Sequence, residues 1–495
     1  MPLEREVKLG AGPAFHLPDL TGVVDGVEVA PPETVRLATV YYDTPDLRLA
    51  RWGVSLRQRA GEGWTLKLGA VQSGQVLERN EITFAGNGKK PPRAALDVVR
   101  AYVRRSELVP VARLSTLRRR VRLTDGNGTR VAEVVDDEVS VRDGRRVAAR
   151  FREIEVEVAS SDATETVVAP LITRLRGAGA GAPDPTPKHI RALGPRSLEA
   201  PEVAPEPLVV GAPAKDVIRH ALAESVANLL HHDPLVRTGR DPEAVHQARV
   251  ATRRLRSNLR TFRPLLDVEW TESLRSELAW LAQSLGAVRD SEVLLERLRE
   301  RASSLPAGDQ RSAAGLLRVL ETEIDQLRKK LDADLASQRY LDLLERLVAA
   351  VHEPVALADA DQPATAVLPA LATSPWRRLR STVRKLPDAP TDPELHRIRI
   401  LAKRARYAAE AVAPVSGEEA SAFARQAAKL QTVLGEHQDS VTAQAWLRRS
   451  RVSGRRAFVA GELIALERMA AAKAQARWRK TWQALERKRL RSWMP

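Results

Sequence analysis

Two hydrophobic periods divide the chain. Between residues 3 and 158, apolar and polar positions alternate in short runs, separated by turn sequences such as Asp-Gly-Asn-Gly at 125–128. Alternation with a period of two is typical of β-strands that bury one face. After residue 214 the period lengthens to about 3.6 over long segments, which predicts helices packed as a bundle. The pattern predicts an α+β multidomain chain.

The alternating part predicts a sheet with charged residues on one face of nearly every strand. We expect strands at 3–9, 34–43, 53–60, 63–70, 76–84, 111–124, 129–142 and 148–158, and helices near 93–105 and 162–178. Acidic residues concentrate in the first and last strands, and basic residues in the middle ones. For any single strand, a solvated outer face would explain the charges. The whole set favours a closed antiparallel barrel of about eight strands whose charged faces surround a charged ligand; a metal on one wall and a phosphate chain on the other would fit.

An ordered set of short motifs resembles a known family. Glu4-Arg-Glu6-Val-Lys8 resembles the ExExK signature of the CYTH, or triphosphate tunnel metalloenzyme, superfamily. Motifs similar to the others of this family follow in its order: Tyr42-Asp43-Thr44, Leu56-Arg57-Gln58-Arg59, Thr65-Leu66-Lys67, Glu78-Arg79-Asn80-Glu81, the arginines at 118–120 and Glu153-Ile-Glu155-Val-Glu157. The ordered set is far more specific than ExExK alone.

The resemblance implies an eight-stranded antiparallel tunnel, flanked by helices, that binds triphosphates with Mg²⁺ or Mn²⁺. Carried over residue by residue, it implies a catalytic set of Glu4, Glu6 and Lys8, and metal binding by Glu4, Glu6, Glu153 and Glu155, with Glu157 and Asp136 as further candidates. It implies phosphate binding by Lys8, Arg57, Arg59, Lys67, Arg79, Arg118, Arg120 and Lys188. Among the consecutive arginines 118–120, we expect the even pair to face inward. These residue types fit the chemistry, because hard cations prefer carboxylate oxygens and phosphoryl transfer depends mainly on positioning and charge neutralisation.

A proline-rich run separates the two parts of the chain. Residues 195–213 contain too many prolines for a helix or a central strand and predict a semi-rigid linker. We therefore predict a tunnel domain at 1–194 and a helical domain at 214–495.

The helical part carries an internal repeat. Its first copy places His246, Arg249, Arg253, Arg256 and Arg260 at steps of three and four residues, which puts the five side chains on one helix face. A second copy follows 150 residues later, with His396, Arg399, Lys403 and Arg406 in the same phase and Glu410 in the place of Arg260. The segments that start at Leu285 and Leu434 also match. We expect half-repeats at about 214–350 and 351–495.

Two basic stripes on separate helices predict an anionic ligand. Aligned cations at i,i+4 spacing repel each other. Long Lys and Arg side chains on solvated helices explain most charge runs, but here the phase is duplicated and a histidine begins each copy. Asp290 and Asp439 are expected to cap helices or to orient an arginine rather than to bind a metal.

The stripes resemble the motifs of the CHAD family of helical domains. The relevant segments are His-x-x-Arg-Val-x-x-Arg-Arg-Leu-Arg at 246–256 and Leu-His-x-x-Arg-x-x-x-Lys-Arg-x-Arg-Tyr at 395–407. The resemblance implies an all-α bundle with an internal two-fold repeat that binds polyphosphate through the stripe residues. The basic C-terminal segment with three tryptophans is expected to be a last bundle helix with buried Trp side chains, although a membrane-surface helix is an alternative.

Charge and composition narrow the choice of ligand. The net charge of +16 divides into +5 for residues 1–200 and +11 for the remainder, which favours polyanions: nucleic acid, an anionic membrane surface or polyphosphate. Aromatic residues make up 4% of the chain, so base-stacking recognition is poorly supported and no specific nucleic acid is expected. The absence of cysteine excludes disulfides and thiolate metal sites. No segment resembles a membrane span or a secretory signal, which predicts a cytoplasmic protein, and a polyphosphate ligand would allow association with polyphosphate granules.

The sequence favours a metal-dependent phosphohydrolase that acts on inorganic triphosphate or short polyphosphate, with a helical domain that binds longer chains. A non-enzymatic polyphosphate-binding or targeting protein is one alternative. Adenylyl cyclisation of ATP, another activity of the CYTH family, is a second, and nucleic-acid binding through the stripes is a third.

Overall fold

The computed structural model describes residues 3–69, 71–73, 76–86, 88–159, 164–239 and 241–495. The chain forms two compact units, Met1–Glu202 and Val203–Pro495. The predicted linker at 195–213 contains a short 3₁₀ helix, η2 (Pro195–Leu198), and no further helix. The predicted domain boundaries stay predictions.

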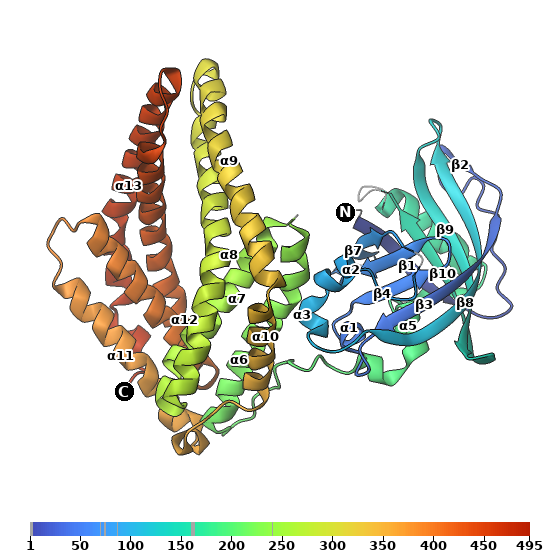
Figure 1. Cartoon of the computed structure of the whole chain (residues 1–495), viewed down its shortest axis with the longest axis horizontal. Helices are drawn as coiled ribbons and strands as arrows, with labels where there is room; N and C mark the ends of the chain where they lie inside the picture. Colours follow the sequence, from blue (N-terminus) through green and yellow to red (C-terminus); the bar gives the residue numbers. More distant parts are fainter. Residues whose placement is uncertain (1–2, 70, 74–75, 87, 160–163, 240) are drawn as a thin grey trace. The chain divides into compact units, whose positions relative to one another are not determined.

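The first unit is a closed eight-stranded antiparallel barrel, as predicted (Figure 1). In order around the barrel, the strands are β1 (Leu3–Ala11), β10 (Arg146–Val158), β9 (Arg130–Asp143), β8 (Val109–Asp125), β3 (Glu33–Asp43), β4 (Ser55–Arg59), β5 (Gly63–Lys67) and β7 (Val76–Phe84). Pairing of β7 with β1 closes the ring. Within the barrel, β1 therefore lies between the acidic strand β10 and strand β7, which carries Arg79.

Short strands and helices surround the barrel. The additional strands are β2 (Val27–Val29), β6 (Val71–Ser73) and β11 (Ala180–Pro183). The helices are α1 (Arg48–Arg51), α2 (Arg93–Val98), α3 (Arg100–Val103), a π-helical turn η1 (Thr164–Val168), α4 (Ala169–Gly177) and α5 (Lys188–Leu193). The helix predicted near 93–105 is broken at Val99, and residues 162–163 of the other predicted helix lie outside the described residues.

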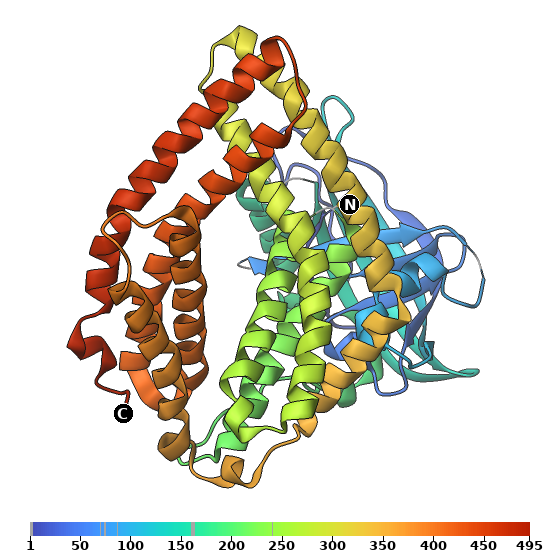
Figure 2. The same cartoon turned by 60° about the vertical axis from the view of Figure 1, so that its left-hand side comes forward.

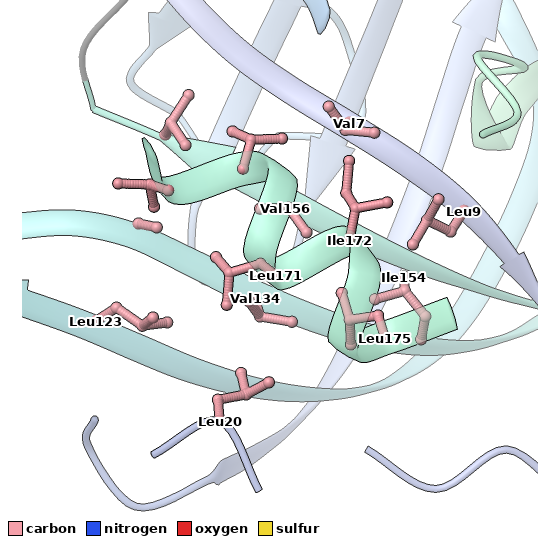
Figure 3. Packing of buried hydrophobic residues seen from close by; sticks show 14 of the residues in the cluster. Val7, Leu9, Leu20, Leu123, Val134, Ile154, Val156, Leu171, Ile172 and Leu175 are labelled. Atoms are coloured by element: carbon pink, nitrogen blue, oxygen red, sulfur yellow. The ribbon is translucent and has the colours of Figure 1, made fainter. Parts of the chain in front are cut away.

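Strand alternation separates an apolar outer face from the charged interior. Val7 and Leu9 of β1 pack with Ile154 and Val156 of β10 in an apolar cluster outside the barrel (Figure 3). Helix α4 covers this cluster with Leu171, Ile172 and Leu175. Burial of these side chains stabilises the wall, at about 1.5–3 kcal/mol for each fully buried aliphatic side chain. Because successive residues of a strand point to opposite faces, burial of the apolar side chains outside the barrel also fixes Glu6, Lys8, Glu153 and Glu155 on the inner face.

The second unit is helical, as predicted. Its helices are α6 (Ala214–Thr238), α7 (Pro242–Thr261), α8 (Val268–Ser303), α9 (Ala307–Ala336), α10 (Gln338–His352), α11 (Ala364–Arg384), α12 (Asp392–Arg449) and α13 (Arg455–Leu485). Short 3₁₀ helices follow at η3 (Arg263–Leu265), η4 (Ala358–Asp361) and η5 (Lys488–Arg491). Helices α8 and α9 form one long hairpin, and α12 and α13 form another (Figures 1 and 2).

The helix boundaries follow the sequence repeat. Helices α6 and α11 begin at Ala214 and Ala364, and α7 and α12 begin at Pro242 and Asp392. Within α12, Gly417 has non-helical backbone angles (φ 72°, ψ −159°), so the long helix consists of two helices joined at a kink. The part before Gly417 corresponds to α7, and the part after it corresponds to α8.

The tryptophan-rich C-terminal segment belongs to the bundle. Trp478 and Trp482 of α13 are buried in an apolar cluster with Trp376 and Phe423, and the rings of Trp376 and Trp482 stack with centroids 5.5 Å apart. The prediction of a last bundle helix is confirmed. None of the helices in the described part of the chain is long and apolar enough to cross a membrane.

Candidate functional site

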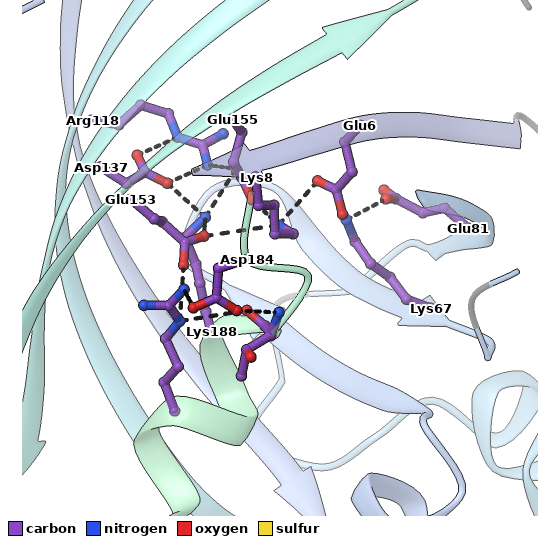
Figure 4. A network of polar contacts seen from close by, with 12 residues as sticks. Glu6, Lys8, Lys67, Glu81, Arg118, Asp137, Glu153, Glu155, Asp184 and Lys188 are labelled. Atoms are coloured by element: carbon purple, nitrogen blue, oxygen red, sulfur yellow. Dashed lines mark hydrogen bonds and ion pairs between the residues drawn. The ribbon is translucent and has the colours of Figure 1, made fainter. Parts of the chain in front are cut away.

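The barrel interior contains a network of ion pairs between acidic and basic side chains (Figure 4). Lys188, from α5, places its Nζ 2.8 Å from Asp137 Oδ2, 2.7 Å from Glu153 Oε1 and 2.9 Å from Glu155 Oε2. Lys8 Nζ lies 3.0 Å from Glu6 Oε2 and 3.8 Å from Glu153 Oε1, and it also contacts Glu155. All these side chains are buried. The charges of β1, β9, β10 and α5 therefore converge on one wall of the tunnel.

Further basic residues line the opposite wall. Arg57 and Arg59 come from β4, Lys67 from β5 and Arg79 from β7. Arg59, Lys67 and Arg79 are each less than a tenth exposed. Lys67 Nζ lies 3.2 Å from Glu81 Oε2, and Arg59 Nη1 lies 2.8 Å from Glu62 Oε2. The pKa of Arg59 is lowered by burial and by the neighbouring charges of Arg57 and Arg118. An anion in the tunnel would relieve this repulsion.

The mutual contacts shift the protonation equilibria of the acidic wall. Burial alone would lower the pKa of Lys188, but Glu153, Glu155 and Asp137 raise it well above its usual value. Burial alone would raise the pKa of Glu155, but Lys188, Lys8 and Arg118 hold it well below its usual range. For Glu153 burial prevails and raises the pKa. The protonation state of each group on the acidic wall therefore depends on the charges of its neighbours.

Strand phase separates the three consecutive arginines of β8. Arg118 faces inward and forms two hydrogen bonds with Asp137, from Nε to Oδ1 at 2.9 Å and from Nη2 to Oδ2 at 2.7 Å. Arg119 contacts Asp136 and Glu138 on the outer side. Arg120 has the phase of Arg118 but forms a bidentate pair with Glu33, at 2.9 and 3.0 Å.

The candidate metal ligand Asp136 lies on the outer face. It is paired in register with Ile154, an outer-face residue, and its carboxylate accepts hydrogen bonds from Arg152. The neighbouring Asp137, paired in register with Glu153, is the acid that faces the tunnel. We missed Asp137 in the sequence because two adjacent aspartates leave the inward one undecided. The phase of Ala132 and Val134, which belong to the outer apolar cluster, could have identified it.

A group of carboxylates could hold a cation. Glu6, Glu155 and Glu157 each place a carboxylate oxygen within 4.8 Å of the others, and Glu6 Oε1 is buried without a hydrogen-bond partner among the described residues. This donor set fits a hard divalent cation. Glu153, also predicted as a ligand, points instead to Lys188 and Lys8. The backbone of Glu4 lies in β1, and its side chain lies outside the described residues.

The two basic stripes line one cavity of about 790 Å³ in the helical unit. From the first copy it contains His246, Arg249, Arg253, Arg256 and Arg260, and from the second copy His396, Arg399 and Lys403. Helix α8 adds Arg289 and Arg297, and α12 adds Arg404 and Tyr407. Sequence reasoning missed Arg289 and Arg297 because they lie outside both repeated stripes.

The repeat places equivalent arginines against equivalent glycines. A methyl group on Gly286 would lie 3.5 Å from Arg249 Nε, and one on Gly435 would lie 3.6 Å from Arg399 Nε. Arg249 also binds Asp290, with Nη2 2.7 Å from Oδ1. Asp290 and Asp439 both lie within helices and do not cap them; of the two expected roles, contact with an arginine is the one that the structure shows for Asp290.

The cavity holds an excess of positive charge. Arg253, Arg256, Arg260, Arg399, Lys403 and Arg404 have no ion-pair partner in the part of the chain that the structure describes. Burial, followed by the nearby charges of Arg404, Arg275 and Arg256, lowers the pKa of Arg260 to about 10. Such a group of cations is best compensated by a multivalent anion.

Arg406 does not line the cavity. Its Nε lies 2.7 Å from Glu410 Oε1, and Glu410 also binds Arg254 of α7 at 3.1 Å. Glu410 occupies the position that corresponds to Arg260 of the first copy, and its ion pair with Arg406 holds that side chain outside the cavity. Arg404, two residues earlier in α12, which the sequence places beside the second stripe, lines the cavity instead. Polyphosphate binding by either residue stays a prediction.

Two family models match the chain. The CYTH domain model matches residues 2–188 and the CHAD domain model matches residues 220–448. Uncharacterized protein MT2285 of Mycobacterium tuberculosis (strain CDC 1551 / Oshkosh) is 32% identical over 472 residues, which cover 89% of this chain and 87% of that protein. The chain belongs to the CYTH–CHAD family. Uncharacterized protein Rv2226 of Mycobacterium tuberculosis (strain ATCC 25618 / H37Rv) matches this CYTH–CHAD chain with the same identity and coverage.

Solved structures also resemble parts of this CYTH–CHAD protein. PptA from Streptomyces chartreusis is 27% identical with a TM-score of 0.47, and the match covers 55% of this chain and all of that one. The CHAD domain from the plant Ricinus communis is 27% identical with a TM-score of 0.47, and the match covers 57% of this chain and 96% of that one. The family membership rests on the sequence matches. It makes the barrel a CYTH tunnel domain of the metalloenzyme type that carries out phosphoryl transfer, and the helical unit a CHAD domain.

Proposed function

We propose that the CYTH tunnel hydrolyses inorganic triphosphate or the ends of short polyphosphate chains with Mg²⁺ or Mn²⁺, and that the CHAD domain binds polyphosphate. The main support is the charge arrangement in the tunnel. Carboxylate oxygens of Glu6, Glu155 and Glu157 lie within 4.8 Å of one another, and buried cations occupy the facing wall. A cation on one side and a phosphate chain on the other would satisfy both sets of charges.

Each wall has a separate role in this proposal. Glu6, Glu155 and Glu157 form the metal-binding group, and Glu4 and Glu153 are further ligands proposed from the family resemblance, although the Glu153 carboxylate contacts Lys188 and Lys8. A bound divalent cation lowers the pKa of a coordinated water and neutralises phosphoryl charge. The phosphates are bound and oriented by the basic residues Arg57, Arg59, Lys67, Arg79 and Arg118. Arg120, which pairs with Glu33, is a further phosphate-binding residue. Lys188 and Lys8 keep the carboxylates ionised.

Phosphate release measured with malachite green tests the proposal. Tripolyphosphate, long-chain polyphosphate and ATP are each supplied with Mg²⁺ or Mn²⁺, and we expect release from tripolyphosphate. Glu6→Gln should reduce kcat at least a hundredfold, since it removes a metal ligand at constant volume. Glu78→Gln is the matched control, because Glu78 pairs with Arg5 on the outer face of the β1–β7 pair. No phosphate release from any of the three substrates would contradict the proposal.

The same assay separates the alternatives. The contacts of Lys8 and Lys188 with Glu155 specifically favour a ligand pocket without turnover, because these lysines compete with a metal for the carboxylate. Polyphosphate binding without turnover by the wild type, unchanged in a Glu4→Ala/Glu6→Ala variant, would establish the binding protein. Cyclic AMP formed from ATP would establish the cyclase.

The CHAD cavity supports polyphosphate as its ligand. We expect Arg399→Ala to weaken long-chain polyphosphate binding about tenfold or more in a titration, the loss typical of one charged hydrogen bond. Arg406→Ala is the control, because Arg406 is held by Glu410 outside the cavity. Binding should also weaken as salt rises. Displacement of polyphosphate by an equal charge concentration of DNA would instead indicate a general polyanion site. A cytoplasmic location, with association with polyphosphate granules, is part of the same proposal.

A further inference from the structure

One buried histidine in the tunnel has no part in the roles assigned so far. His189 follows Lys188 in α5 and is 5% exposed. Its ring stacks on Tyr41 of β3, with ring centroids 5.3 Å apart and an angle of 27° between the planes. Tyr41 lies opposite Arg57 in the β3–β4 pair, and directly paired residues of antiparallel strands share a face of the sheet. The imidazole therefore lies on the tunnel side of the wall, among the phosphate-binding cations.

The polar edge of this imidazole is unsatisfied. His189 Nε2 is buried and has no hydrogen-bond partner among the described residues. More than nine in ten buried polar groups in proteins do have a partner, so an unpaired one inside a candidate binding chamber calls for a ligand. Packing alone does not require a ring nitrogen here, because a phenyl ring could stack on Tyr41 equally well.

The surroundings of His189 define the chemistry of that ligand. Burial, followed by the charges of Arg79, Lys8, Arg57 and Lys67, lowers the pKa of His189 to about 3. The ring is therefore neutral near neutral pH and cannot act as one more cation. A neutral imidazole can donate one hydrogen bond to a phosphoryl oxygen or accept one from a protonated phosphate. Three of these four cations, Arg57, Lys67 and Arg79, are among those proposed to bind phosphate, so a phosphoryl group held by them would come within reach of the ring.

The geometry points to His189 as a further substrate-binding residue of the tunnel, whose Nε2 forms a hydrogen bond with a phosphoryl oxygen of the triphosphate chain. This inference rests on the proposed function, because it names a contact within the same site. It assigns no proton transfer to the ring. It also gives α5 two contributions to the site: Lys188 to the acidic wall and His189 to the phosphate chain.

The first test observes the ring directly. The ¹⁵N signals of the histidine imidazoles are recorded on the full-length wild-type chain with EDTA, before and after addition of tripolyphosphate. The signal of His189 is assigned by its absence in His189→Phe. We expect its Nε2 resonance to move, while that of the exposed His16 stays in place. An unchanged His189 signal at saturating tripolyphosphate would overturn the inference, even for a chain that hydrolyses triphosphate.

The second test separates a hydrogen bond from packing. His189→Phe keeps the ring and removes the nitrogen, whereas His189→Gln places an amide nitrogen near the position of Nε2. We expect His189→Phe to raise the KM for tripolyphosphate about tenfold, and His189→Gln to recover most of this loss, with thermal unfolding close to that of the wild type in both. Equal losses in the two variants, or an unchanged KM in His189→Phe, would show that the ring only packs. A wild-type chain that releases no phosphate but whose His189 signal moves would contradict the triphosphatase and support the contact.

Discussion

At the scale of single residues, Lys188 is the centre of the acidic wall. Three carboxylates, those of Asp137, Glu153 and Glu155, lie within 3 Å of its Nζ, and the lysine side chain is 9% exposed. Buried charges of one sign cannot be left together without compensation, since each would keep its desolvation cost and gain repulsion. Lys188 therefore has a structural role in addition to its proposed role of keeping the carboxylates ionised.

Substitution of this lysine tests the structural role. We expect Lys188→Met to lower the free energy of unfolding of the tunnel domain by about 3–5 kcal/mol, the range found when one partner of a buried ion pair is removed. The measurement is chemical denaturation without added metal or phosphate. Lys215→Met in the helical domain is the control: Lys215 pairs with one aspartate, Asp361, but both side chains are about half exposed or more, so this substitution should leave stability nearly unchanged. A similar small effect of both substitutions would show that the acids are compensated by other groups.

The acidic wall also predicts a pH dependence of stability. Burial opposes ionisation of Asp137 and Glu155, but Lys188 and its neighbours hold the pKa of each carboxyl below its usual value. Because these pKa values are lower in the folded than in the unfolded chain, the two carboxylates stabilise the fold above about pH 4.5, and this contribution disappears as the pH falls further. Glu153, whose pKa is raised by burial, acts in the opposite direction. The urea midpoint of the tunnel domain should therefore fall between pH 5 and pH 3, and fall less in Asp137→Asn.

At the scale of elements, repeated sequence produces two halves that differ in one important detail. In the first half, η3 separates α7 from α8, whereas in the second half the same positions lie in the continuous helix α12 with its kink at Gly417. The kink turns the basic stripe before it and the Gly435 segment after it toward each other, so that Arg399 packs against Gly435. The repeat is therefore preserved in the site although the connection differs.

Alanine substitution of two glycines in the helical domain should have opposite effects on stability. Gly417 has φ 72°, a conformation that costs a side chain about 1 kcal/mol or more, so Gly417→Ala should lower the melting temperature of the CHAD domain. Gly461 lies in α13 without positive φ and with open space at its Cβ position, so Gly461→Ala should raise stability by about 0.5–1 kcal/mol. Differential scanning calorimetry measures both. A stabilising Gly417→Ala would show that α12 is straight at this position.

At the scale of the whole molecule, each unit has its own core. The tunnel domain buries the cluster of Val7, Leu9, Ile154 and Val156 under α4, and the helical domain buries the cluster around Trp376 and Trp478. Units with separate cores are expected to fold separately. That one unit catalyses and the other binds stays a prediction.

Separate expression of the two units tests this organisation. We expect residues 1–202 to fold as a β-rich fragment that retains phosphate release from tripolyphosphate, and residues 203–495 to fold as a helical fragment that retains long-chain polyphosphate binding. Circular dichroism and thermal melting monitor folding, and the two assays above monitor function. The full-length chain, at the same molar concentration, is the reference. An unfolded or aggregated fragment in either case would show that the units depend on each other for stability.

Most of the secondary-structure elements, and the charge of both candidate sites, could be predicted from the amino-acid sequence alone. Period-two alternation places the charges of β1 and β10 on one face and apolar residues on the other, and the 150-residue repeat places two basic stripes in one helical domain. These features depend on local spacing, so they are visible without a fold. The contacts between side chains of different elements required the folded structure. Asp137 rather than Asp136 faces the tunnel because β9 is held in register with β8 and β10, and Arg404 replaces Arg406 because Glu410 lies within reach of α7. His189 could not be found from the sequence, since its neighbours come from five strands of the barrel.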